Sequence, residues 1–415
     1  MTDKILEIKY LIIGGGVAGT TAAESIRKKD PAGSIAIVSE EPFRLYSRIM
    51  LSKPNFFLEK ISFEQVWLKT EAWYKENNIE FYAGKRALNL NTAEKKVTLQ
   101  DNEVLKYEKL LLAIGGCVRL FGAPGSEKEG VFYLRTLEDA KAVISAVKTA
   151  KRAVVIGGGF IGFEMCEMLR LAGVEVTLVL REPYFWQILL DDVSGKMIEG
   201  ALEKGGVKII RSNEVSDIIG KDSVEKVILK DGSELPCDML IVGIGLQCPF
   251  SWVEAAGIKV NKGILANEYL ETTAPDVWTA GDCAEFQDLI LGERIQLANW
   301  ANAQMQGRRA GLNMSGEKET FRLVSFYTTR GFGISIAFVG DIRPEAGRTI
   351  TCRGSREANS YARLISKDGE LIGATLINRT QEMGAISKVI EMNIKITGLE
   401  KELADPLFDL GILVK

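Results

Sequence analysis

Histidine is absent from this chain of 415 residues. Without imidazole the chain cannot use a Ser–His or Cys–His pair as a nucleophile, and it cannot bind a metal through histidine. The cysteines are few and scattered, at Cys117, Cys166, Cys237, Cys248, Cys283 and Cys352. None of their spacings matches the CxxC or CxxxxC patterns of zinc, iron–sulfur or dithiol sites. We therefore expect no metal site and no redox disulfide, and we interpret the cysteines as buried free thiols in a reducing compartment.

Long apolar runs and an excess of one charge are also lacking. No apolar run reaches the roughly 18 residues that a membrane-spanning helix needs. The start, MTDKILEIKYLIIGGG, mixes charged and apolar residues, unlike a signal peptide. The formal net charge of −3 does not suit a strongly basic nucleic-acid-binding protein. These absences predict a cytoplasmic globular protein that binds neither nucleic acid nor membrane.

Glycine, by contrast, is plentiful and forms a duplicated motif. The stretches YLIIGGGVAGTTAAE and AVVIGGGFIGFEM each contain GxGxxG directly after an apolar run that is typical of a β-strand. The motif glycines are Gly14, Gly16 and Gly19 in the first copy and Gly157, Gly159 and Gly162 in the second. A helical pattern and a second β-branched run follow each copy, as in the βαβ unit of a dinucleotide-binding fold. Two such units predict two nucleotides facing each other, one of them usually a tightly held flavin.

Each glycine of such a unit has its own physical role. The first permits a tight turn, the second lets backbone N–H groups reach a pyrophosphate, and the third lets the helix pack close to the strand. The N-terminus of the helix then favours the negative phosphates.

Three further glycine-containing stretches indicate how the two units are arranged. LLLAIGGCVR (110–119) predicts a buried strand that ends in glycines, and IVGIGLQCPF (241–250) repeats that pattern after the second unit. VWTAGDCAEF (277–286) predicts a strand and a glycine turn, and a helix follows in LANWANAQMQG. The second unit is therefore predicted to be inserted into the first domain, which resumes near Gly245.

We expect an α/β fold with two Rossmann-like dinucleotide-binding domains and a small α+β C-terminal domain. The predicted boundaries are 1–118 with 245–320 for the first domain, 119–244 for the second and 321–415 for the third.

The C-terminal part shows a different pattern. RGFGISIAFVGD and YARLISKDGELIGATLIN alternate as β-strands do, with DGE as a turn, and AISKVIEMNIKI predicts an amphipathic helix. We expect this domain to cap the flavin domain; a dimer face or a docking site for a partner is the alternative. Phe326, Tyr327 and Arg330 are candidates to shield a flavin ring or to meet a partner. The last 14 residues predict a loosely tied extension.

Seven motifs, taken in order, resemble the two-dinucleotide-domain flavoprotein reductases related to glutathione reductase. They are GGGVAGTTAAE, SRIMLSK, LLAIGG, GGGFIGFE, VGIG, GDCAEF and NWANAQMQG. The chain is most similar to the branch of rubredoxin, ferredoxin and nitrite-reductase-type NAD(P)H:acceptor reductases, which have no redox-active disulfide. The resemblance implies the three-layer ββα architecture of glutathione reductase.

The resemblance implies that FAD binds the first unit. Glu40 or Glu41 would hold the adenosine ribose, and Arg48 and Lys53 match the basic pair of the family's YxRPxLSK segment along the flavin. The family often has Pro where this chain has Ile49-Met50, and a solvated basic loop is the alternative interpretation. The complete set of residues implied for FAD is Gly14, Gly16, Gly19, Glu40, Glu41, Arg48, Lys53, Ala113, Gly115, Gly281, Asp282 and Trp300.

The second unit would bind NADH or NADPH. Glu164 matches a family glutamate near the nicotinamide, where it could pair with Lys53; an ordinary helix residue is the alternative. Leu180 stands where NADH-using relatives carry glutamate, and Arg181 after it suits the 2′-phosphate of NADPH, whereas Glu182 and Gln187 do not. We therefore predict a slight preference for NADPH, with dual use as the alternative. The residues implied for NAD(P) are Gly157, Gly159, Gly162, Glu164, Arg181, Gly243 and Gly245.

Disulfide-reducing relatives place cysteine in the segment that here reads EEPFRLYSRIMLSKPN, and those with a cysteine pair also use a C-terminal histidine. This chain has neither, so electrons must leave the flavin without a thiol relay. Hydride transfer needs positioning and exclusion of water rather than imidazole, and Lys53, Glu164 and Trp300 are the candidate catalytic residues. The acceptor or donor is predicted to be an iron–sulfur protein such as ferredoxin or rubredoxin. An oxidase that reduces O2, a flavin-dependent signalling protein and a disulfide or CoA-disulfide reductase are the alternatives, and a homodimer is compatible with the sequence.

Overall fold

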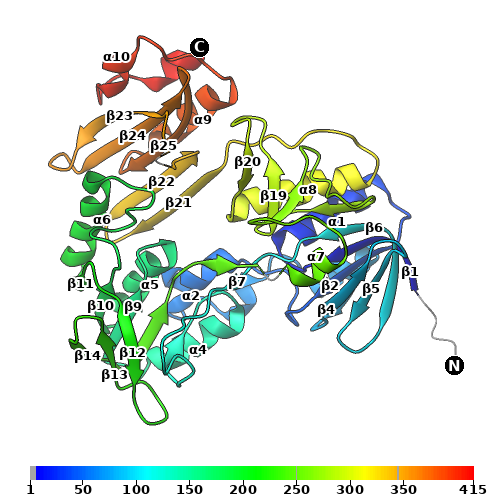
Figure 1. Ribbon diagram of the computed structural model, residues 1–415, viewed down its shortest axis with the longest axis horizontal. Coiled ribbons are helices and arrows are strands. Elements are labelled where there is room, and N and C mark those ends of the chain that lie inside the picture. Colours follow the sequence, from blue (N-terminus) through cyan, green and yellow to red (C-terminus); the bar gives the residue numbers. More distant parts are fainter. Residues whose placement is uncertain (1–5, 249, 344) are drawn as a thin grey trace. The chain divides into compact units, whose positions relative to one another are not determined.

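The computed structural model describes residues 6–248, 250–343 and 345–415, and the chain divides into two units (Figure 1). The first unit comprises residues 1–47, 66–117 and 247–325. The second comprises residues 48–65, 118–246 and 326–415. The segment 48–65, which contains SRIMLSK after its first residue, thus belongs with the second unit. The domain boundaries expected from the sequence stay predictions.

The first unit is built on a mixed sheet in the order β3-β2-β1-β6-β5-β4, with β18 paired to β6. Strands β3, β2, β1, β6 and β18 are parallel, and β4 and β5 add an antiparallel edge. A separate sheet has the order β17-β19-β20. The strands are β1 (Leu6–Ile13), β2 (Ile35–Ser39), β3 (Ile79–Ala83), β4 (Ala87–Asn91), β5 (Lys96–Leu99), β6 (Val104–Leu112), β17 (Ile264–Ala266), β18 (Val277–Thr279), β19 (Ala284–Gln287) and β20 (Arg294–Gln296). The helices are α1 (Val17–Lys29), α3 (Glu71–Glu76), α7 (Ser251–Ala255) and α8 (Trp300–Met314).

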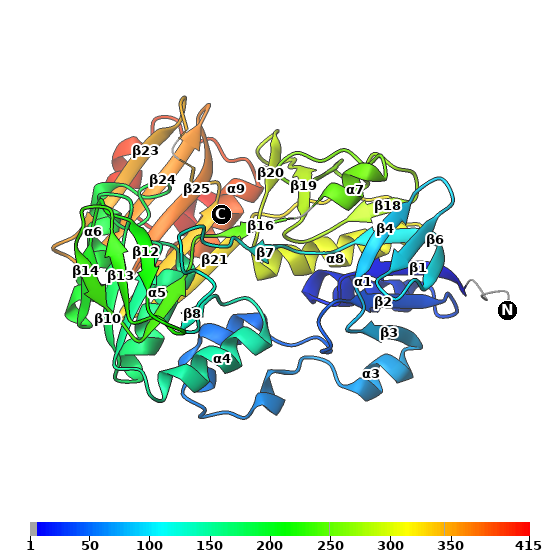
Figure 2. The ribbon, with the colours of Figure 1, turned by 60° about the horizontal axis from the view of Figure 1, so that its bottom comes forward.

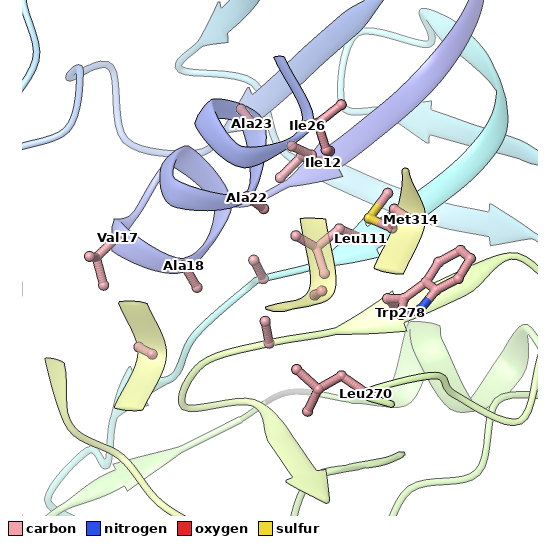
Figure 3. Close-up of a cluster of buried hydrophobic side chains, with 14 of the residues drawn as sticks. Ile12, Val17, Ala18, Ala22, Ala23, Ile26, Leu111, Leu270, Trp278 and Met314 are labelled. Carbon is pink, nitrogen blue, oxygen red and sulfur yellow. The ribbon is translucent and has the colours of Figure 1, made fainter. Parts of the chain in front are cut away.

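Helices α1 and α8 lie side by side (Figure 2). Their backbones approach closely because the facing positions are small: a Cβ added at Gly307 would lie 2.1 Å from the carbonyl oxygen of Ala18. Val17, Ala18 and Ala22 of α1 belong to the buried core above the sheet (Figure 3). Burial of this apolar surface is the main force that holds the helix pair on the sheet.

The second unit contains a five-stranded parallel sheet in the order β11-β10-β9-β15-β8. Its central strands are almost continuously apolar, as expected for strands covered on both faces. An antiparallel sheet, β12-β13-β14, lies within the same part of the chain. The strands are β8 (Val131–Phe132), β9 (Arg152–Ile156), β10 (Glu175–Val179), β11 (Val207–Ile210), β12 (Val215–Ile219), β13 (Lys226–Leu229), β14 (Glu234–Pro236) and β15 (Met239–Val242). The helices are η1 (Arg48–Ser52), α2 (Pro54–Phe57), η2 (Phe63–Val66), α4 (Leu137–Val147), α5 (Phe160–Leu171) and α6 (Asp192–Lys204).

The second unit also contains a five-stranded antiparallel sheet in the order β21-β22-β25-β24-β23, which we call the C-terminal sheet. Figure 1 shows α9 and α10 on one side of it and α6 on the other. The strands are β21 (Phe326–Gly331), β22 (Ile334–Gly340), β23 (Thr349–Ser355), β24 (Ser360–Lys367) and β25 (Glu370–Ile377). The helices are η3 (Thr380–Glu382), α9 (Met383–Glu391), α10 (Glu400–Ala404) and η4 (Leu410–Val414). Two short strands, β7 (Cys117–Val118) and β16 (Leu246–Gln247), span the points where the chain passes between the units.

The architecture confirms the predicted α/β fold with two Rossmann-like domains and a small C-terminal domain. Two local predictions for the C-terminal part are corrected. The helix predicted through Ile396 ends at Glu391. The last residues are not a loose extension, because the buried side chains of Arg353 and Arg379 donate to the carbonyl oxygens of Phe408 and Pro406. Among the residues described, no helix is long and apolar enough to cross a membrane.

Candidate functional site

The first glycine motif forms a tight turn between β1 and α1. Gly14 has φ of +120°, and a Cβ there would lie 2.0 Å from the carbonyl oxygen of Ala113. A Cβ at Gly19 would lie 1.9 Å from the carbonyl oxygen of Gly14, whereas a Cβ at Gly16 would meet nothing within 4 Å. The outer two glycines therefore close the turn, and the middle one faces open space where a ligand can approach the backbone.

The second motif repeats this geometry between β9 and α5. Gly157 has φ of +108°, and a Cβ there would lie 2.3 Å from the carbonyl oxygen of Gly243. A Cβ at Gly162 would lie 1.9 Å from the carbonyl oxygen of Gly157, and Gly159 again faces open space.

The helices that follow both turns begin without a side-chain cap. Gly16 and Gly159 are the N-cap residues, no side chain accepts from the first turn, and neither first turn contains an acidic residue. Other helices here are capped, for example α8 by Asn299. Amide groups left without an intrahelical partner at a helix N-terminus favour an anion. Each unit therefore has one cradle of the form that a pyrophosphate fits.

Acidic groups follow β2 in the first unit, at the rim of the first cradle. The carboxylate of Glu40 is exposed and lies 3.7 Å from the guanidinium of Arg86. The carboxylate of Glu41 accepts a hydrogen bond of 2.7 Å from the hydroxyl of Tyr46. Both acids stand at the strand end where a ribose is expected in this fold.

Helix α8 carries buried polar side chains next to the turn at Gly281. The amide of Gly281 donates to Oε1 of Gln306 at 2.7 Å. Nε2 of Gln306 and Oδ1 of Asn302 are buried and have no protein partner. Unpartnered buried polar atoms are costly, so these two atoms fit a polar ligand or a water. Trp300 is the first residue of this helix, and the backbone oxygen of Asp282 accepts from Gln296.

Glu164 is the centre of a polar cluster in the second unit. It lies on α5, its residue is 4% exposed, and its Oε1 lies 2.5 Å from Nζ of Lys53. The hydroxyl of Thr329 on β21 donates to the same oxygen at 2.8 Å, and the hydroxyl of Ser52 donates to Oε2. Arg48, in the same basic segment, donates instead to the backbone oxygen of Arg135. One cationic donor and two hydroxyl donors offset the free-energy cost of burying this carboxylate.

Other groups on α5 also contact the C-terminal sheet. Burial raises the pKa of Glu167, although the amide of Phe332 donates to its carboxylate at 2.7 Å and Lys53 acts in the opposite direction. Burial, and then the charge of Glu164, raises the pKa of Tyr327. The ring of Tyr327 packs on Phe160, with ring centroids 3.5 Å apart. Phe160 is the first residue of α5, so it lies at the mouth of the second cradle.

The end of β10 carries the residues expected to choose between NADH and NADPH. The side chain of Leu180 is fully buried and offers no acceptor for a ribose hydroxyl. The side chain of Arg181 is 69% exposed, and its guanidinium lies 2.8 Å from the carboxylate of Glu182. Gln187 follows in the loop between β10 and α6.

The chain matches the pyridine nucleotide-disulphide oxidoreductase family over residues 8–307. It belongs to this family. The biphenyl dioxygenase system ferredoxin–NAD(+) reductase component of Paraburkholderia xenovorans is 29% identical and matches 96% of both chains. The crystal structure of a ferredoxin reductase from Rhodopseudomonas palustris has a TM-score of 0.91 and 27% identity, and covers 98% of this chain and 100% of its own.

Longer proteins also match. The nitrite reductase [NAD(P)H] of Bacillus subtilis is 26% identical over 95% of this chain. The chain spans about half the length of this relative and of the assimilatory nitrate reductase electron transfer subunit of the same organism, 48% and 52%. These relatives confirm the resemblance to ferredoxin and nitrite reductases, and FAD and NAD(P)H are typical cofactors of the family.

The family's expected residues fall into two groups. The first unit brings together Gly14, Gly16, Gly19, Glu40, Glu41, Ala113, Gly115, Gly281, Asp282 and Trp300. The second unit holds Arg48, Lys53, Gly157, Gly159, Gly162, Glu164, Arg181, Gly243 and Gly245. The Lys53–Glu164 contact has the geometry expected from the family resemblance, and the cofactor contacts of all these residues stay predictions.

Four polar residues of these clusters were not identified from the sequence: Ser52, Thr329, Asn302 and Gln306. Ser52 lies inside the SRIMLSK motif, Asn302 and Gln306 lie inside the NWANAQMQG motif, and Thr329 lies in a strand whose partners are not visible in the sequence. Of these four residues, only Thr329 lies in no sequence motif.

The cysteines differ from expectation in their exposure. Cys166, Cys237 and Cys283 are buried, whereas Cys117 and Cys352 are exposed and Cys248 is intermediate. The interpretation that all six are buried is therefore wrong for the two exposed thiols. In the described parts of the chain no group of acidic and cysteine side chains could hold a metal ion.

Proposed function

We propose that this protein is a flavoprotein reductase that binds FAD in the first cradle and NAD(P)H in the second, and exchanges electrons with an iron–sulfur protein of the ferredoxin or rubredoxin kind. The observation that carries the proposal is the pair of uncapped glycine cradles in a chain whose SRIMLSK segment contains no cysteine. The names of the Paraburkholderia and Rhodopseudomonas relatives support a ferredoxin-type partner.

The chain's own residues supply binding and orientation. The amides of the first turns of α1 and α5 hold the pyrophosphates, and Glu40 or Glu41 holds the ribose of FAD. By the family resemblance, Asp282 and Trp300 would contact the flavin part of FAD, Ala113, Gly115 and Gly281 would be its close backbone approaches, and Arg48 would lie along the flavin. When bound, FAD accepts a hydride from NAD(P)H and can pass electrons on singly.

The Lys53–Glu164 pair fixes charge close to where the nicotinamide is expected. Glu164 holds the ammonium of Lys53 through a 2.5 Å contact, and Ser52 and Thr329 prevent the carboxylate from rotating away. If the flavin ring also lies nearby, the Lys53 cation would stabilise the negative charge that develops on the flavin as it accepts a hydride. No imidazole is needed for this role, which agrees with a chain that has none.

We propose a slight preference for NADPH. The buried Leu180 offers no carboxylate to the 2′-hydroxyl of NADH. The exposed Arg181 can bind a 2′-phosphate if its guanidinium leaves the carboxylate of Glu182. The negative carboxylate of Glu182 repels a phosphate, so the site is also compatible with NADH. The cytoplasmic location and the homodimer stay predictions.

The test is anaerobic steady-state turnover of the FAD-loaded protein. NADPH and NADH are compared as donors, ferredoxin and rubredoxin as acceptors, and O2 uptake in air is the control. We expect reduction of at least one iron–sulfur protein at well above the rate of O2 uptake, with a lower KM for NADPH than for NADH. Slow transfer to both proteins beside rapid O2 uptake would instead identify an oxidase.

A further inference from the structure

One face of the C-terminal sheet contacts both α5, which begins at the second cradle, and the loop between β10 and α6. Directly opposed residues of antiparallel strands share a face, and the pairing places one row across all five strands. The row is Tyr327, Phe338, Thr375, Arg363 and Cys352. Thr329 and Tyr361 lie two residues from this row on β21 and β24, so they share the face.

At one end this face contacts α5. Thr329 donates to Glu164, and Tyr327 packs on Phe160. Further along β21, a Cβ at Gly331 would meet the side chains of Phe163 and Glu167 at 2.8 and 2.9 Å, so β21 runs close against the helix. Phe326 and Arg330 lie on the opposite, exposed face of β21.

At the other end the face contacts residues 181–191, which we call the β10–α6 loop. The hydroxyl of Tyr361 donates to Oδ2 of Asp191 at 2.8 Å. The buried guanidinium of Arg363 donates to the backbone oxygen of Leu189 at 2.9 Å and lies 3.6 Å from Asp191. The ring of Phe338 packs edge-on against Trp186, with centroids 5.2 Å apart.

The β10–α6 loop needs such support because its backbone is strained. Trp186 has φ of +60°, a conformation that a bulky residue adopts only when its surroundings hold it. From the domain's own side, Glu199 on α6 accepts from the amide of Phe185 at 2.8 Å. Asp191 ends the loop as the N-cap of α6 and accepts from the amide of Ser194. The loop is therefore held between α6 and the C-terminal sheet.

We propose that Tyr361 and Arg363 are positioning residues for the adenosine end of NAD(P)H. They fix Leu189 and Asp191, and through them the loop that begins with Arg181, the residue placed to meet a 2′-phosphate. A loop ordered before the nucleotide arrives loses less entropy on binding, which raises affinity. This inference rests on the proposed function, because it assumes that the second cradle binds NAD(P)H.

Two variants test the inference without breaking the fold. Y361F removes one hydroxyl, and D191N removes the charge that faces Arg363 while asparagine keeps the N-cap. Y269F, a tyrosine of the first unit, is the matched control. The dissociation constants of 2′,5′-ADP and 5′-AMP are measured by calorimetry on the FAD-loaded proteins, beside kcat and KM for NADPH.

We expect both variants to bind 2′,5′-ADP roughly three- to tenfold more weakly, to raise KM with kcat unchanged, and to keep a cooperative melting transition. Unchanged dissociation constants in both variants would overturn the inference, and so would a fall in kcat with KM unchanged. A wild-type protein that binds neither nucleotide would overturn the proposed function of the second cradle and this inference with it.

Discussion

Glu164 connects three separate segments of the second unit. Lys53 comes from the segment before α2, Thr329 from β21, and Glu164 itself from α5, and Ser52 completes the shell. Every donor in this cluster is aimed at one carboxylate that is 4% exposed. Such an arrangement fixes the position of the Lys53 ammonium, and the proposed role of Lys53 in hydride transfer depends on a fixed position.

We expect the substitution E164Q to slow flavin reduction. The neutral amide no longer attracts Lys53, so reduction by NADPH should fall roughly tenfold, which is about 1.4 kcal/mol in the barrier. T329V should produce a smaller loss, and T329S should restore the wild-type rate because it keeps the hydroxyl. Anaerobic stopped-flow absorbance of the flavin measures all three.

T328V is the control, since Thr328 is exposed on the opposite face of the same strand. Rates for E164Q and T329V equal to that of T328V would show that the cluster only stabilises the fold.

The residue-level site was partly predictable. The glycine motifs identify both cradles because a tight turn and an open backbone leave few alternatives to glycine. The family resemblance suggested the Lys53–Glu164 pair. Thr329 could not be found in this way, because its contact depends on how β21 lies along α5, which no local pattern encodes.

Among the elements, the α1–α8 pair is central to the first unit. Helix α1 begins at the first cradle, and α8 carries the unpartnered Asn302 and Gln306 atoms. Gly307 and Gly311 allow the contact, because a Cβ at either would lie within 2.6 Å of a backbone oxygen of α1. A change in the distance between α1 and α8 therefore moves the glycine turn at the start of α1 relative to the buried polar atoms of α8.

We expect the substitution G307A to weaken FAD binding. The added methyl group overlaps the carbonyl of Ala18, and overpacking of this kind costs roughly 1–3 kcal/mol. The purified variant should show a lower ratio of flavin to protein absorbance and a lower melting temperature. G200A is the matched control, because Gly200 lies in α6 with nothing within 4 Å of an added Cβ.

G200A should retain FAD and gain roughly 0.5–1 kcal/mol from helix propensity. Equal flavin content in G307A, G200A and wild type would refute the importance of the helix contact.

Element positions were more predictable than element ends. The strands of both βαβ units and helix α8 lie where the apolar patterns placed them. The helix predicted to Ile396 ends at Glu391, since Asn393 has φ of +51° and Lys395 instead bridges to Glu370. The final residues seemed unattached because Arg353 and Arg379, which hold them, lie far away in sequence.

For the molecule as a whole, the duplicated motif predicted the fold class, because each GxGxxG stretch follows a strand and precedes a helix, as in a dinucleotide-binding βαβ unit. The placement of segment 48–65 with the second unit was not visible in the sequence. It follows from contacts such as those of Ser52 and Lys53 with Glu164, which are 112 and 111 residues apart. The contact of the C-terminal sheet with α5 and the β10–α6 loop was hidden for the same reason.

Electrons are proposed to leave the flavin without a thiol relay, and alkylation of the thiols before electron transfer tests this proposal. The FAD-loaded protein is reduced with one equivalent of NADPH, its accessible thiols are alkylated, and it is mixed anaerobically with oxidised ferredoxin in a stopped-flow instrument. The untreated protein serves as the control. We expect equal rates of ferredoxin reduction in both samples, because neither of the exposed thiols, Cys117 and Cys352, takes part. Loss of electron transfer after alkylation, with the flavin still reduced, would contradict this proposal.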